Sequence, residues 1–93
     1  MREEAYSVYI VRCANGALYT GITTDVIRRV GEHNAARGAR YTRVHAPVEL
    51  VWTENHPDRA TAMKREAQIK RLPRMKKLEL IRGRKSPQKK NPL

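Results

Sequence analysis

The stretch from residue 7 to residue 33 constrains the fold most, because two strand-like runs flank an Asn-Gly pair and a helix-like run follows. The first run, YSVYIVRC at 6–13, is rich in the β-branched and aromatic residues that favour strands. Asn15-Gly16 is a turn signal, since both residues tolerate positive φ, and ALYTGI at 17–22 forms the returning strand. The stretch therefore predicts strand, turn, strand and helix.

The length of this turn decides which face of the hairpin each inner tyrosine occupies. A two-residue loop places Tyr9 and Tyr19 on opposite faces, whereas a three-residue loop with Gly16 in a left-handed bulge places them on the same face. The longer loop also gathers a mostly apolar set on the other face: Tyr6, Val8, Ile10, Leu18, Thr20 and Ile22. Because the face that can be buried sets the register, we predict the three-residue loop, with Gly21 beside the two tyrosines.

The helix-like run after the hairpin has a polar start and an apolar stripe. Thr23 or Thr24 can cap it, and Asp25 suits its first turn. Val26, Ile27 and Val30 form the stripe. We expect this helix to end between residues 34 and 38 and to be followed by a basic loop at 36–46.

The second half of the chain predicts one more strand and two helices. VELVWT at 48–53 reads as the third strand, and Asp58 can cap a helix over about 59–71. Pro73 suits the start of a further short helix that ends near Ile81. We therefore expect one α/β (α+β) domain at 1–81, with a three-stranded antiparallel sheet flanked by helices. Residues 82–93 carry five basic residues and no acid, which predicts a disordered basic tail.

Positive charge is the strongest signal in the composition. Twenty Lys and Arg against nine Asp and Glu give a net charge of +11. Such an excess favours a polyanionic partner, and nucleic acid is favoured over an anionic membrane because no segment pairs a basic face with large apolar residues. No run is long and apolar enough for a transmembrane helix, and no signal peptide is recognisable. Cys13 is the only cysteine, so no disulfide partner is expected and a cytoplasmic location fits.

The motifs of the hairpin and of the helix after it resemble a known family. Ser7-Val8-Tyr9 followed by Tyr19-Thr20-Gly21 is similar to the paired signature of the GIY-YIG endonuclease superfamily. Arg29 and His33 lie at the spacing of the family's helix. The basic loop, the following strand and the KREAQIKRL run at 64–72 look like the small single-domain branch related to Slx1-type nucleases, which includes UPF0213-like proteins. Ser7 and Thr20 depart from the name-giving glycine and isoleucine, and the only late asparagine is Asn91.

The resemblance implies a catalytic role for Tyr9, Tyr19, Arg29, His33 and Glu66. Tyr9 is implied as the base that activates water, with Tyr19 orienting water or phosphate. A phenol acts as a base only if its pKa of about 10 is lowered, and Arg29, a metal or a deprotonated Tyr19 can change that balance. Arg29 and His33 are four apart on one helical face, where a guanidinium suits a phosphate and an imidazole can exchange a proton with a tyrosine. A solvated basic face is the alternative.

Glu66 lies near the apolar face that Ala62 and Ile69 define on the second helix. A carboxylate facing inward needs a partner, and the resemblance implies Mg²⁺ or Mn²⁺. A salt bridge to Arg29 is the alternative. The three histidines and one cysteine make no zinc pattern, and we expect Trp52 in the core or at a sheet edge.

These residues predict a metal-dependent endonuclease that hydrolyses DNA phosphodiester bonds, with an implied role in DNA repair or recombination. Backbone contacts are expected from a basic set: Arg37, Arg40, Tyr41, Arg43, Lys70 and Arg71. A non-catalytic nucleic-acid-binding module with the same fold is the alternative. A basic interaction protein without a nucleic-acid partner is a third reading.

Overall fold

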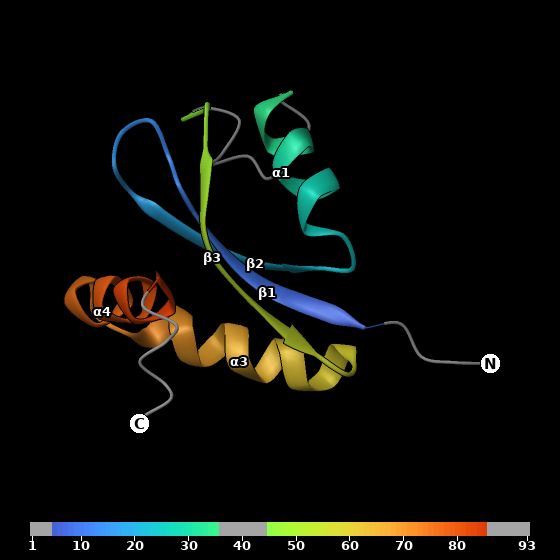
Figure 1. The fold of residues 1–93 in the computed structure, drawn as a ribbon. Helices are drawn as coiled ribbons and strands as arrows, with labels where there is room; N and C mark the ends of the chain where they lie inside the picture. The colour runs from blue at the N-terminus through green and yellow to red at the C-terminus, as the bar shows by residue number, and fades with distance from the viewer. Residues whose placement is uncertain (1–4, 36–44, 86–93) are drawn as a thin grey trace.

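Three antiparallel strands form one sheet in the order β2-β1-β3, with β1 at its centre. In this computed structural model, which describes residues 5–35 and 45–85, β1 spans Tyr6–Arg12, β2 Leu18–Thr23 and β3 Glu49–His56. Helix α1 (Val26–Asn34) lies on one side of the sheet, and α3 (Arg59–Arg71) and α4 (Arg74–Lys85) lie on the other (Figure 1). The predicted fold class is confirmed.

The hairpin between β1 and β2 has the predicted three-residue loop. The Cys13 N–H donates to the Ala17 carbonyl at 2.8 Å, and Gly16 has a φ of 88°. Tyr9 pairs with Gly21. Val11 pairs with Tyr19, so the two inner tyrosines share a face as predicted.

The residues of β1 alternate between two separate hydrophobic clusters. Val8 and Ile10 face α3 and α4 in a cluster with Trp52, which confirms that this tryptophan is part of the core. On the α1 side, the cluster combines four fully buried residues with a half-buried rim: Tyr9, Val11, Cys13 and Val48, with Tyr19, Val26, Val30 and Leu50. The sheet therefore separates an apolar layer from a layer that contains tyrosines.

Several predicted boundaries differ from the structure. Asp25 is itself the N-cap of α1, and its carboxylate accepts a hydrogen bond from the Arg28 N–H at 3.1 Å, because a carboxylate reaches that N–H better than the threonine before it. Strand β3 runs to His56 because it pairs with β1 over the whole length of β1, out to Tyr6. Asp58 caps α3 at the predicted position.

Helix α4 continues to Lys85, so residues 82–85, which we assigned to the tail, are helical. Arginine and lysine are good helix formers and suit the C-terminal end of the helix dipole, which offsets the cost of Gly83. The rest of the predicted tail, 86–93, lies outside the described residues. Within the described ranges, no helix is long and apolar enough to cross a membrane.

Candidate active site

Two buried residues, Tyr9 and His33, and the partly buried Tyr19 form the centre of the candidate site. The Tyr9 hydroxyl lies 2.9 Å from His33 Nε2, within hydrogen-bond distance. The Tyr9 ring centroid is 5.9 Å from that of His33. The ring of Tyr19 meets the imidazole edge-on, with centroids 5.6 Å apart. The structure therefore brings together three residues that the sequence places on two strands and a helix.

Gly21 gives Tyr9 the space to reach this position. The two residues pair across β1 and β2, and the tyrosine ring lies over the glycine. A Cβ at Gly21 would lie 2.5 Å from the Tyr9 hydroxyl oxygen and 2.7 Å from its Cζ, closer than any real Cβ contact. The glycine of the second motif is thus needed for close side-chain packing, and its φ is not in the left-handed region.

Helix α1 is anchored at both ends, which fixes its functional face. Asp25 caps the first turn. At the other end, the Asn34 side chain accepts from the Val48 N–H at 2.6 Å and donates to the Val48 carbonyl at 3.1 Å. These two bonds hold the last turn of α1 against the start of β3. His33, one residue before Asn34, is therefore held against the tyrosines and is fully buried.

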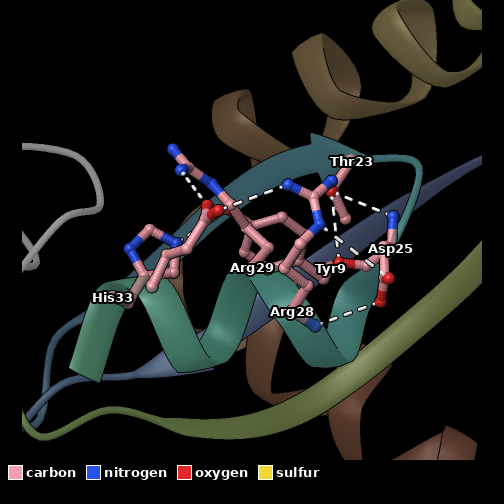
Figure 2. A network of polar contacts seen from close by, with 7 residues as sticks. Tyr9, Thr23, Asp25, Arg28, Arg29 and His33 are labelled. Atoms are coloured by element: carbon pink, nitrogen blue, oxygen red, sulfur yellow. Dashed lines mark hydrogen bonds and ion pairs between the residues drawn. The ribbon is translucent and has the colours of Figure 1, made fainter. Parts of the chain in front are cut away.

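Arg29 lies one turn before His33 on the same helix (Figure 2). Its Nη1 donates to Glu32 Oε1 at 2.9 Å, and a further hydrogen bond links its guanidinium to the Tyr9 hydroxyl. Arg28 Nη1 donates to the other oxygen of Glu32 at 3.2 Å. Glu32 thus bridges Arg28 and Arg29 on the helix that carries His33. The sequence reading missed Glu32, although its spacing of three and four residues from the arginines is a signal for helical ion pairs.

Burial raises the pKa of Tyr9 above its ordinary value of 10.0. The hydrogen bond from Arg29 opposes this shift, while the negative charges of a deprotonated Tyr19 and of Glu66 add to it. A deprotonated Tyr19 therefore changes the balance at Tyr9 against deprotonation, because two like charges repel. Tyr9 is a neutral phenol at neutral pH.

Burial also lowers the pKa of His33 below 6.5, and the positive charge of Arg29 lowers it further. The imidazole is therefore neutral at neutral pH, and Nε2 can accept a proton from the phenol of Tyr9. Both side chains are neutral in the resting protein, and their 2.9 Å contact allows a proton to pass from the phenol to the imidazole. A pair of this kind can perform general acid–base chemistry.

Glu66 lies on α3, on the other side of the sheet from α1. Its side chain is 21% exposed and pairs with Lys70 at 3.2 Å. Arg29 pairs with Glu32 instead, so the salt bridge between Glu66 and Arg29 that we considered as an alternative is not formed. The influence of Glu66 on the pKa of Tyr9 indicates that the two side chains interact electrostatically.

Arg65, the neighbour of Glu66, fixes the rotation of α3 against β3. Its Nε donates to Glu54 Oε1 at 2.9 Å, and its guanidinium lies over the ring of Trp52 at 5.8 Å from the centroid. His56 Nε2 lies 2.9 Å from the same carboxylate oxygen. This contact across the layers holds one side of α3 on β3.

The predicted nucleic-acid contacts are only partly described. Lys70 and Arg71 are exposed at the C-terminal end of α3. Four further predicted contacts lie outside the described residues: Arg37, Arg40, Tyr41 and Arg43. Among the described residues, no three His, Cys, Asp or Glu side chains gather as a metal-binding group.

Comparisons with known proteins agree with this fold. Residues 5–79 match the GIY-YIG catalytic domain. A UPF0213 protein of Desulfotalea psychrophila is 54% identical over 80 residues, which cover 85% of this chain and 73% of that protein. A UPF0213 protein of Staphylococcus aureus is 48% identical over 81 residues, covering 87% of this chain and 99% of that protein.

A solved structure has the same arrangement. The solution NMR structure of the UPF0213 protein BH0048 from Bacillus halodurans matches with a TM-score of 0.59 and 42% sequence identity. The match covers 89% of this chain and 88% of that one.

Proposed function

The chain belongs to the GIY-YIG family, and from this membership we propose that it is a metal-dependent endonuclease that hydrolyses DNA phosphodiester bonds. The observation that carries the proposal is the 2.9 Å contact between the Tyr9 hydroxyl and His33 Nε2, with Arg29 beside them. Phosphodiester hydrolysis needs a base for water and positive charge for the phosphate, and this group of residues supplies both. A role in DNA repair or recombination, in the cytoplasm, extends the proposal and rests on the family resemblance.

In the proposed mechanism, the attacking water transfers its proton to Tyr9 as the phenol proton passes to His33 Nε2. This coupling lets a phenol of raised pKa act as a base, because the neutral imidazole receives the charge. Arg29 donates to the non-bridging oxygens of the scissile phosphate, where negative charge grows in the transition state. Tyr19, whose ring meets the edge of the imidazole, orients the water or the phosphate.

The residues at the site fit a divalent cation of the Mg²⁺ type. Such ions are often bound through one or two carboxylates, waters and substrate phosphates, without a complete protein cage. Glu66 supplies one partly buried carboxylate, and its present partner Lys70 is more than half exposed and can move away. Glu66 would hold a Mg²⁺ or Mn²⁺ ion, which would supply a Lewis acid to polarise the phosphate and stabilise the leaving oxygen. Lys70 and Arg71 are proposed to hold the backbone nearby.

The test is cleavage of plasmid and branched DNA by the purified protein with Mg²⁺, Mn²⁺ or a chelator. We expect cleavage that requires the metal and is lost in Tyr9→Phe and in Glu66→Gln. Both variants should stay folded: Tyr9→Phe leaves His33 without one partner, which costs about 1–3 kcal/mol. Glu66→Gln should keep DNA binding, since it removes one repelling charge.

A non-catalytic nucleic-acid-binding module is the second candidate, and the raised pKa of Tyr9 favours it. DNA binding without cleavage under any metal condition would establish this candidate and refute the nuclease. Failure to bind any nucleic acid would contradict both.

A further inference from the structure

Two arginines and one glutamate form a small charged group on the outer side of α1. Glu32 offers one carboxylate oxygen to Arg29 at 2.9 Å and the other to Arg28 at 3.2 Å. The three side chains are half-buried or exposed, and Arg28 also lies 3.9 Å from Asp25. Figure 2 shows both arginines on the helix that also carries His33, with Tyr9 beside them.

A carboxylate held in this way resembles a bound phosphodiester. Both groups present two oxygens in a plane, and the fork of an arginine fits either one. Two guanidinium groups that converge on one anion therefore form a receptor for two anionic oxygens. One of the two arginines is already hydrogen-bonded to the Tyr9 hydroxyl, so the receptor adjoins the contact between Tyr9 and His33.

The contacts with Glu32 are weak enough to exchange. Arg28 and Arg29 lie four and three residues before Glu32, and such pairs on partly exposed helix faces shift an equilibrium by only about twofold each. A backbone phosphodiester carries one negative charge, as a carboxylate does, but it arrives as part of a polyanion whose binding releases counterions. Replacing Glu32 with a phosphate as the partner of the two arginines therefore costs the protein little free energy.

We propose that Arg28 and Arg29 form a phosphate subsite that Glu32 fills in the free protein, and that a backbone phosphate of the nucleic acid takes the place of this carboxylate. The inference rests on the proposed function and deepens it. It gives Arg28 a share of the phosphate that Arg29 holds. Glu32 keeps both guanidinium groups in position until the substrate arrives.

The test is equilibrium binding of a 20-base-pair DNA duplex in chelator, measured by fluorescence anisotropy over a series of salt concentrations. Chelator prevents metal-dependent cleavage, so the result is independent of catalysis. Arg28→Gln should reduce the slope of log affinity against log salt by about 0.9, the contribution of one phosphate contact. Arg12→Gln is the matched control, because Arg12 also pairs with a glutamate, Glu49 at 3.7 Å, but at the far end of β1.

The second arm removes the competing carboxylate. Glu32→Gln should raise the affinity about fourfold beyond the matched control Glu49→Gln, since two contacts of about twofold each no longer compete. Both variants add one unit of positive charge, so their difference excludes a general electrostatic effect. The slope of Glu32→Gln should equal that of the wild type, because the same phosphates are contacted. Melting curves verify that all four variants are folded.

Equal slopes for Arg28→Gln and Arg12→Gln, or equal affinities for the two glutamine variants, would overturn the subsite. Absence of DNA binding by the wild type would overturn the subsite together with the proposed function. Binding with the expected differences but without cleavage in a separate metal assay would leave the subsite standing and refute the nuclease alone.

Discussion

The two faces of the central strand differ in what they bury. Val8 and Ile10 point into an apolar layer against α3 and α4, whereas Tyr9, between them, points into a layer that holds His33 and has Arg29 at its edge. The first face buries apolar side chains, and removing their surface from water stabilises the short chain. The second face buries groups that titrate and shifts their pKa values. One strand thus serves stability on one side and proposed chemistry on the other.

The difference shows how a small domain can hold a polar site. Buried polar groups cost free energy unless they are paired, and Tyr9 and His33 satisfy each other at 2.9 Å. The apolar face supplies the stability that such a site lacks. Mutations on the two faces should therefore separate stability from activity.

The largest effect on stability is expected on the apolar face. Ile10→Ala removes a fully buried side chain from the cluster with Trp52 and should cost about 3 kcal/mol of unfolding free energy. Denaturant unfolding measures this loss, and the activity of the fraction that remains folded should be near that of the wild type. Tyr9→Phe, at the neighbouring position, should instead remove the activity and have the smaller effect on the free energy of unfolding. If Ile10→Ala removes activity while the protein is fully folded, the division between the faces is wrong.

A smaller effect is expected at Gly21, where the hairpin meets the tyrosine. Gly21→Ala places a methyl group against the Tyr9 hydroxyl and Cζ, and the buried ring has little room to move. We expect a loss of about 1–3 kcal/mol and a loss of activity, because the contact with His33 must shift. Gly31→Ala is the control: a Cβ there meets nothing within 4 Å, and the helix should gain about 0.5–1 kcal/mol. Equal stabilities of the two variants in thermal unfolding would contradict the packing argument.

The smallest effect is a pH dependence that belongs to the polar face. Because burial lowers the pKa of His33 below 6.5, the unfolded chain takes up a proton before the folded protein does as the pH falls. Stability is thus fully present above pH 6.5 and declines as the pH falls from there towards the folded pKa, by about 1.4 kcal/mol for each unit between the two values. Urea unfolding at several pH values should show this decline in the wild type and less of it in His33→Gln. The other histidines are present in both proteins, so identical pH profiles would show that His33 does not titrate differently on folding.

The sequence alone determined the hairpin and most of the elements. Strand residues alternate with a period of two, so one choice of loop length at Gly16 set the face of every residue in β1 and β2. Asp58 marked the start of α3 because the preference of a helix N-cap is local. The motif residues Tyr9, Tyr19, Arg29 and His33 were identified from their spacing, and the shared face of the two tyrosines follows from the register.

Only the tertiary structure decided the partners and the protonation of the site. A sequence does not state how far a helix is rotated on a sheet, so the contact of His33 with Tyr9 became visible only with α1 in place on the sheet. The direction of the Tyr9 pKa shift depended on burial against Gly21 and the imidazole, which outweighs the nearby guanidinium. Local propensities act over a few residues and can be read along the chain. Desolvation and charge pairing depend on distances between segments that only the folded protein defines.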